Sequence, residues 1–298
     1  MKIKSITVTL LAPMTDHAAN RGEKLLGNAS SIKRRPDGRV YISGQMQRHV
    51  LFSAIDRLNE DDPARNGSYV ANGDGPSTDV AHDLRSDLGG YLDTNKDDYS
   101  GRRTAPITAT PGVAQATSQI GRDLLVRLRM DESKDSGKKQ ALATNEFSQS
   151  DLMQMSFHLD VGAVGLTKQY KYEEEAHVGT TYLNHLDDQP GEQSRRVRLF
   201  LDATRSLTDY ANQARNATSG EPQQVLIVLD TKLSRKAARY FAPDANATEK
   251  ARILAELDNR GALYFLGDDT NPDSLSVDEA YQKAIAALPS NELYSPVA

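Results

Sequence analysis

Apolar patterning in this sequence occurs in short segments that long polar stretches separate. Residues 60–100 contain few apolar side chains and much Asp, Gly and Asn, and residues 165–194 are polar with an acidic run at residues 173–175. Hydrophobic residues make up 38% and aromatic residues 6% of the 298 positions, which is a lean supply for a core of this length. The sequence therefore predicts one modest folded body, a single domain over residues 1–298, that carries long polar insertions.

The apolar segments show the periods of both strands and helices. Residues 4–11 alternate and are β-branched, which predicts a strand, and the polar residues 12–36 are typical of an irregular excursion. Further strands are predicted at residues 39–42, 102–110, 124–130, 157–164, 225–230 and 262–266. Helices are predicted at residues 44–58, 196–211, 248–258 and 276–288. This order favours the α+β class, with a split β-α-β arrangement of the ferredoxin-like or RNA-recognition type.

Several classes of protein are disfavoured by what the sequence lacks. It contains no cysteine, which excludes disulfides and thiolate metal sites. The first eleven residues lack the long apolar run and the cleavage site of a signal peptide. No stretch approaches the roughly 18 apolar residues of a membrane span. We therefore expect a cytoplasmic protein without a membrane partner.

Motifs of catalysis are also missing from the sequence. The six histidines form no HxH or HExxH pattern, and neither G-x-S-x-G nor Walker A occurs. Asp16, Asp56 and Asp160 lack the paired spacing expected of a metal-dependent nuclease. We therefore predict a protein that is not an enzyme and needs neither a metal ion nor a cofactor.

Charge is segregated along the chain. The net charge of −5 by itself disfavours a nucleic-acid binder. Residues 1–59 nevertheless carry ten basic and four acidic side chains, a net charge of +6, whereas residues 60–100 carry −7. Screening limits the reach of distant charges to about 8–10 Å, so a basic face can persist on an acidic protein.

Residues 16–35 combine basic and short polar side chains with glycine. Lys and Arg neutralise phosphates, and Asn offers hydrogen bonds to sugar and phosphate oxygens. The RNA-binding residues predicted in this segment are Asn20, Arg21, Lys24, Asn28, Lys33, Arg34 and Arg35. An ordinary solvated basic loop explains the same composition, and this alternative stays open.

The start of the helix predicted at residues 44–58 is a second candidate. With Ser43 as its N-cap, the free backbone N–H groups of the first turn form an anion site. Gln45, Arg48 and His49 would flank that end of the helix, because positions i, i+3 and i+4 share a face. We predict that these four residues contact RNA, and a plain surface helix is the alternative.

Two later segments complete the set of predicted RNA-binding residues. Arg102 and Arg103 precede a strand-like run and are predicted to bind phosphate, although they could instead pair with nearby acids. Gln213 and Arg215 lie in the loop at residues 212–220, between a helix and a buried strand. A plain turn would explain that loop equally well.

Together these residues resemble a known family. The strand at residues 4–11, Asn20-Arg21-Gly22, Gly27-Asn28 and Tyr41-Ile42-Ser43-Gly44-Gln45-Met46-x-Arg48-His49 are similar to the opening of the DevR-type backbone subunits of type I CRISPR Cascade complexes. These subunits belong to the repeat-associated RNA-binding superfamily. The run Arg102-Arg103-Thr104-Ala105-Pro106-Ile107 is similar to an internal strand motif of the same family.

The resemblance implies a modified ferredoxin-like or RNA-recognition fold that forms a palm, with a finger region at residues 60–152 and a thumb region at residues 166–194. Copies of such subunits stack head to tail along a CRISPR guide RNA, which then pairs with target DNA. The expected function is thus that of a non-catalytic guide-RNA-binding backbone subunit in a DNA-targeting surveillance complex. Its expected partners are the guide RNA, the target DNA, other copies of itself and other Cascade subunits.

Two other functions stay open. Type III relatives of the family cut RNA with a loop aspartate, so a metal-dependent RNA endonuclease with Asp16 or His49 in its site is the main alternative. An interaction scaffold that binds no RNA is the second.

Overall fold

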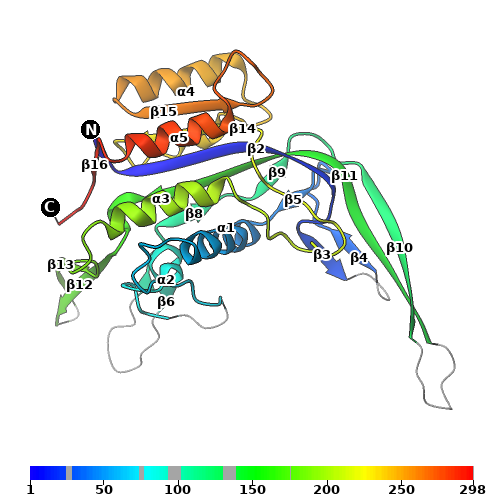
Figure 1. The fold of residues 1–298 in the computed structure, drawn as a ribbon, viewed down its shortest axis with the longest axis horizontal. Coiled ribbons are helices and arrows are strands. Elements are labelled where there is room, and N and C mark those ends of the chain that lie inside the picture. Colours follow the sequence, from blue (N-terminus) through cyan, green and yellow to red (C-terminus); the bar gives the residue numbers. More distant parts are fainter. Residues whose placement is uncertain (25–28, 74–76, 93–101, 130–138, 175, 298) are drawn as a thin grey trace.

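An antiparallel sheet forms the centre of the structure, a computed structural model that describes residues 1–24, 29–73, 77–92, 102–129, 139–174 and 176–297. Its middle strands follow the order β15 (Leu263–Asp268), β14 (Gln224–Asp230), β2 (Ser5–His17) and β11 (Lys139–Asp160), and neighbouring strands are antiparallel. β2 and β11 run through the middle of the molecule (Figure 1). The mixture of this sheet with separate helices is an α+β architecture, as expected.

Shorter strands extend the sheet on the β11 side. β10 (Ile120–Arg129) and the first part of β11 form a long hairpin, while β8 (Ile107–Ala109) and β9 (Gly112–Ala114) pair with the rest of β11. The remaining strands at this side are β5 (Tyr41–Ile42), which pairs with β9, β4 (Ser30–Ile32), which joins β11, and β3 (Arg21–Lys24), which joins β4.

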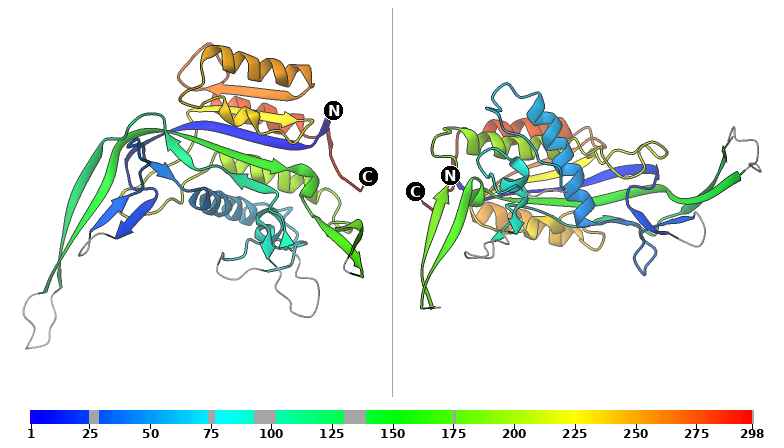
Figure 2. Two further views of the ribbon diagram at one scale, coloured as in Figure 1. Left: turned by 180° about the vertical axis from the view of Figure 1, so that it is seen from behind. Right: turned by 90° about the horizontal axis from the view of Figure 1, so that it is seen from below.

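Among the described residues, three two-stranded pairs lie outside the sheet. They are β1 (Lys2–Ile3) with β16 (Glu292–Leu293), β6 (Tyr91–Leu92) with β7 (Arg102–Arg103), and β12 (Leu166–Glu173) with β13 (Ala176–Asn184). The β12–β13 hairpin falls within residues 166–194, the predicted thumb region. It projects from the opposite end of the molecule to the β10–β11 hairpin in both views of Figure 2.

Helices cover both faces of the central strands. The core on one face combines sheet residues with α1 (Gly44–Glu60), α3 (Glu192–Thr204) and α5 (Val277–Ala287). The other face packs against α4 (Ala247–Asn259) and η2 (Lys236–Arg239). Alternation along β2 and β14 supplies both cores, because successive side chains of a strand point to opposite faces. Ile6, Val8 and Leu10 therefore belong to the first core, and Leu226 and Val228 to the second.

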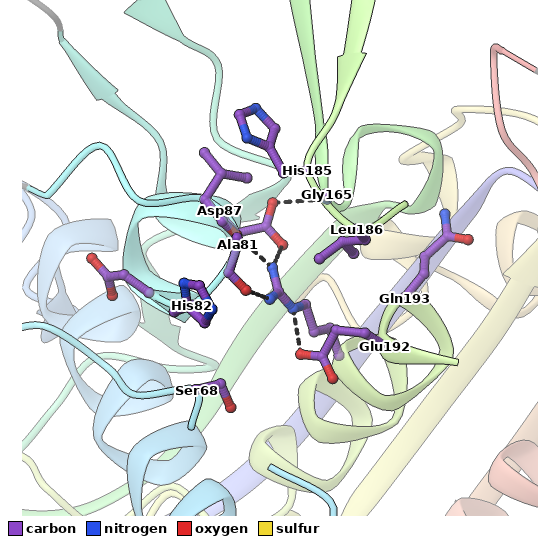
Figure 3. Close-up of polar contacts among 12 residues, drawn as sticks. Ser68, Ala81, His82, Asp87, Gly165, His185, Leu186, Glu192 and Gln193 are labelled. Carbon is purple, nitrogen blue, oxygen red and sulfur yellow. Dashed lines mark hydrogen bonds and ion pairs between the residues drawn. The ribbon is translucent and has the colours of Figure 1, made fainter. Parts of the chain in front are cut away.

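A buried carboxylate joins three segments beneath this sheet (Figure 3). Asp87, in α2 (Leu84–Gly89), is fully buried between the guanidinium groups of Arg103 and Arg196. Its Oδ2 accepts from Arg196 Nη1 at 2.6 Å, and its Oδ1 accepts from the backbone N–H of Gly165 at 2.9 Å. Glu192 provides the second negative charge by accepting from Arg196 Nε at 2.7 Å. The network therefore links α2, the base of the β12–β13 hairpin and α3.

Gly165 is the residue at which the chain turns from η1 (Val161–Ala163) into β12. Its φ of +70° lies in the left-handed region, and a Cβ there would approach Leu186 Cδ1 to 2.3 Å. A larger residue would therefore clash as well as strain the backbone.

Several boundaries differ from those predicted. Residues 12–36 do not form one irregular excursion, because β2 continues to His17 and is followed by β3 and β4. The helix predicted at residues 196–211 begins earlier, at Glu192, and ends at Thr204. The chain then leaves the helix, and Leu207 and Tyr210 are buried in the core on non-helical backbone. None of the described helices is both long and apolar enough to cross a membrane.

We expect Asp87→Asn to lower the free energy of unfolding by about 3–5 kcal/mol, because it leaves two buried guanidinium groups short of a negative charge. Asp209→Asn is the matched control, since Asp209 pairs with Arg57 where both side chains are more than two-fifths exposed. That change should cost less than about 1 kcal/mol. Denaturant unfolding of both variants checks the prediction, and equal losses would contradict it.

His158 should make stability depend on pH. It is 5% exposed, and its Nδ1 lies 2.9 Å from Thr7 Oγ1 in a hydrogen bond. Burial, reinforced by the charge of Arg235, lowers the pKa of His158 from 6.5 to about 4. The unfolded chain therefore binds more protons between these values, so stability present above pH 6.5 is lost as the pH falls to about 4.

The loss should be on the order of 3 kcal/mol. His158→Gln removes this titration and should flatten the profile of unfolding free energy against pH in that window. His49→Gln, at an exposed position, should keep the wild-type slope. A His158→Gln profile parallel to that of the wild type would show that another group sets the slope.

Candidate nucleic-acid interface

Three segments distant in sequence meet at a shallow groove beside β3 and β4, which encloses a volume of only about 10 Å³. We call it the β3–β4 groove, and its polar lining consists of Arg21 from β3, Ser30 and Ser31 from β4, Asn145 and Glu146 from β11, and Asn212, Arg215 and Asn216 from the loop at residues 212–220. Two of the predicted RNA-binding residues, Arg21 and Arg215, are therefore brought together.

Side-chain hydrogen bonds fix the loop at residues 212–220 against the end of β2. Asn212 donates to the carbonyl of Ala18 at 2.9 Å, and Asn216 donates to that of Asp16 at 2.8 Å. Gln213 donates to the carbonyls of Thr208 and Thr218 at 2.7 and 2.9 Å. The structure thus gives Gln213 a role in shaping the loop, while Arg215 is exposed on it.

The β3–β4 groove offers more donors than acceptors. Arg21 and Arg215 are exposed and make no ion pair within the described part of the chain. The carboxylate of Glu146 is engaged, because it accepts from Arg34, Arg122 and the backbone N–H of Ile32. Buried donors without a partner normally mark a missing water or ligand. Asn145 Nδ2 is such a donor among the described residues.

The other predicted residues of the first basic segment differ in their surroundings. Lys24 is exposed, and Lys33 and Arg35 are half-buried. Arg34 pairs with Glu146 at 3.4 Å. Asn20 is only 4% exposed and donates to the carbonyl of Tyr41 at 3.2 Å, so its side chain supports the backbone. Asn28 lies outside the described residues.

The predicted cap of α1 is confirmed. Ser43 has extended backbone, and its Oγ accepts from the N–H of Met46 at 3.3 Å. This hydroxyl satisfies one of the free donors at the start of the helix. Gln45, Arg48 and His49 then line a cleft of about 280 Å³ between α1 and α2, which we call the α1–α2 cleft. Arg48 Nη2 donates to the carbonyl of Gly89 there at 2.6 Å.

Arg103 corrects a sequence-based prediction. It is 6% exposed, and its guanidinium binds Asp87, the carbonyls of Ala163 and Leu166, and Thr167 Oγ1. This side chain is committed to the interior and cannot reach a phosphate without breaking the network. The alternative of pairing with an acid, left open by the sequence, is what the structure shows. Arg102 lies in β7.

Two residues of the candidate sites carry no signal in the sequence. Asn145 lies in the first third of β11, where the sequence shows no clear apolar alternation. Arg85 lies within the acidic residues 60–100, yet it lines the α1–α2 cleft. Neither position carries a motif, and only the pairing of distant segments reveals them.

The described residues contain no group of three or more His, Asp or Glu side chains placed to hold a metal ion.

Comparison with known proteins identifies the fold. No family model matches the sequence, and no curated protein matches it. Solved structures that are similar in fold include a chain of a CRISPR RNA-guided surveillance complex and a chain of such a complex in a pre-nicking state. Each is 12% identical, with a TM-score of 0.55, and the match covers 95% of this chain and 99% of the other. The chain thus shares its fold with chains of CRISPR surveillance complexes along almost its whole length.

We expect Gln47→Ala to lower the free energy of unfolding much more than Gln45→Ala does, although the two residues share the first turn of α1. Gln47 is fully buried, and its Oε1 accepts from the Tyr210 hydroxyl at 3.2 Å. Its removal should cost about 1–3 kcal/mol. Gln45 is exposed, and its loss should change the free energy of unfolding by less than about 0.5 kcal/mol. Thermal and denaturant unfolding of the two variants check this assignment, and similar losses would mean that the faces of α1 are wrong.

Proposed function

We propose that this chain is a non-catalytic, guide-RNA-binding backbone subunit of a DNA-targeting CRISPR surveillance complex, in which copies stack head to tail along the RNA. Its site residues are those of the β3–β4 groove together with Gln45, Arg48 and His49 at the start of α1. The proposal concerns a cytoplasmic ribonucleoprotein whose other partners are target DNA and further Cascade subunits.

The observation that carries this proposal is the convergence of Arg21 and Arg215, which make no ion pair among the described residues, on a groove whose one carboxylate is already engaged. Arg gains most from phosphate when no acid competes for it. The neighbouring side chains are Asn and Ser, which suit sugar and phosphate oxygens. Such contacts recognise a nucleic-acid strand without selecting its bases, as a subunit that accepts any guide requires.

The order of elements supports the palm architecture. Along the chain β2 is followed by α1, then by β8 and β11, then by α3 and β14. In the sheet these strands lie in the order β14, β2, β11 and β8, and both helices pack into one core. This order is compatible with the split β-α-β arrangement that the sequence predicts, and it supports the proposed palm. The similarity in fold to chains of surveillance complexes agrees with it.

The two projecting hairpins support contact with other chains. Leu124 and Val126 on β10 are 65% and 53% exposed, and Tyr170 and Leu183 on the β12–β13 hairpin are 41% and 44% exposed. Exposed apolar side chains gathered on projections are typical of interaction surfaces. A head-to-tail filament uses two different surfaces and need not close, which fits projections at opposite ends.

The alternative of an RNA endonuclease rests on Asp16. Its side chain is exposed at the end of β2, its φ of 45° lies in the left-handed region, and its carbonyl accepts from Asn216 of the groove. Magnesium-dependent cleavage of bound RNA that Asp16→Ala abolishes would favour this function over the proposed one.

We expect Arg21→Gln with Arg215→Gln to weaken RNA binding and to reduce its salt dependence. On a single strand the slope of log affinity against log salt changes by about 0.7 for each phosphate that the protein no longer neutralises, so the slope for the double variant should be shallower by about 1.4. Two unrelated RNAs of equal length should bind with equal affinity to each variant at matched salt. Filter binding or fluorescence anisotropy at several salt concentrations measures both quantities.

The matched control is Arg198→Gln with Arg252→Gln, which removes the same charge from exposed positions on α3 and α4. It should keep the wild-type slope.

Mass photometry with RNAs of increasing length tests assembly, and copy number should rise in steps and collapse when the RNA is digested. The proposal would be contradicted if both double variants lost the same affinity, or if one RNA sequence were strongly preferred. It would also be contradicted if mass photometry gave a species of constant size at every RNA length.

A further inference from the structure

Two arginines in the α1–α2 cleft lie close to each other without an acidic partner among the described residues. The guanidinium carbon of Arg85 is 4.9 Å and that of Arg48 is 6.0 Å from the ring centroid of Phe52. Each is held by one backbone carbonyl, Arg48 by Gly89 and Arg85 by Ala71, both at 2.6 Å. Neither makes an ion pair there, in contrast to Arg103 and Arg196.

The electrostatics of the cleft are those of a site that lacks a counter-ion. Burial, and secondarily the charge of Arg85, lowers the pKa of Arg48. Burial also lowers the pKa of Arg85, which the charges of Asp83 and Asp56 partly offset. Arg48 Nε is moreover a buried donor without a partner in the described part of the chain. A buried donor of this kind costs free energy unless a ligand or a water satisfies it.

The carboxylate in the wall of the cleft is already occupied. Asp83 is fully buried in the cleft wall, and its carboxylate accepts from the backbone N–H groups of Ala71 and Arg85 and from Ser86 Oγ. At the rim, Gln45 and His49 add exposed polar side chains. The cleft therefore presents an excess of donors, which suits a compact anion with several acceptor oxygens.

We propose that Arg48 and Arg85 form a phosphate-binding site in the α1–α2 cleft, which a phosphodiester group of the bound RNA strand occupies. Arg85 is the new element, because it comes from α2 and lies in a segment whose overall charge is acidic. The volume of about 280 Å³ is at the low end for small-molecule pockets, and is large enough for a phosphate with adjoining sugar. A carboxylate from a neighbouring protein chain, which needs less room, is the competing occupant. The site rests on the proposed function only for the identity of its ligand.

The test separates the site from the function. The first measurement is the melting temperature in sodium phosphate against sodium chloride at matched ionic strength. Phosphate should raise the melting temperature of the wild type and of Arg252→Gln, because it binds only the folded state. Arg85→Gln and Arg48→Gln should show a clearly smaller rise, since they keep only the arginines of the β3–β4 groove. Circular dichroism in chloride confirms that both variants are folded.

The second measurement is RNA affinity as a function of salt. Arg85→Gln should weaken binding about tenfold and reduce the salt slope by about 0.7, while Arg252→Gln should change neither. The Arg21→Gln and Arg215→Gln double variant should bind RNA weakly and yet keep its phosphate-dependent rise in melting temperature.

Three results would overturn the proposal. A wild type that phosphate does not stabilise, or an Arg85→Gln variant that it stabilises equally, would remove the anion site. If Arg85→Gln reduces the phosphate-dependent rise in melting temperature but leaves the RNA affinity unchanged, the cleft binds free phosphate or a partner's carboxylate and not the RNA. A wild type that binds no RNA, with the phosphate effect intact, would refute the proposed function and the RNA occupant while leaving an anion site.

Discussion

The buried carboxylate of Asp87, held between two guanidinium groups, is the constraint on which the arrangement of the projections depends. It is contacted by Arg103 from β7, Arg196 from α3 and the backbone of Gly165 at the entry to β12. Desolvating such charges is costly, and the geometry must be good for the attraction to offset that cost. Here Glu192 supplies the second negative charge to Arg196, and it also pairs with Arg195, whose other acidic partner is Asp62. The network thus adds a fixed polar geometry to segments that also contribute apolar side chains, such as Leu88, Val164 and Val197, to one core.

The same residue type behaves in two ways in this molecule, and the difference indicates function. Arg103 and Arg196 are enclosed and fully paired, which makes them structural. Arg21 and Arg215 are exposed beside a carboxylate that other groups already occupy, and Arg48 carries a buried donor without a partner among the described residues. Under the proposed function, these unpaired arginines are the ones that bind the RNA. Composition cannot make this distinction, because it depends on which acids lie within reach.

Features that depend on local sequence were predictable, and features that depend on distant pairing were not. The Ser43 cap, and the capping box of Ser276 with Glu279, follow from residues three positions apart, and both are present. The apolar run of β14 also identified a buried strand. Asp87 and Arg85, in contrast, lie in a segment whose composition indicates solvated polar chain. Asp87 is nevertheless fully buried, because it pairs with Arg103 and Arg196, which lie farther along the chain. Arg103 was predicted to bind phosphate, with pairing to a nearby acid as the open alternative, because the sequence alone does not show that Asp87 lies within its reach.

The β12–β13 hairpin is anchored at one end only, and this has a consequence for how such a projection can vary. Its strands pair from Leu166 and Asn184 at the base to Glu173 and Ala176 near the tip, and the anchoring contacts lie at the base. Adding two residues to each strand would extend it by about 7 Å and keep every side chain on its present face. Adding a single residue to each would exchange the faces of everything beyond it. The length of the β12–β13 hairpin can therefore change in steps of two residues per strand while the central sheet and its helices stay the same. The distance that the hairpin spans can thus be altered, by evolution or by design, independently of stability.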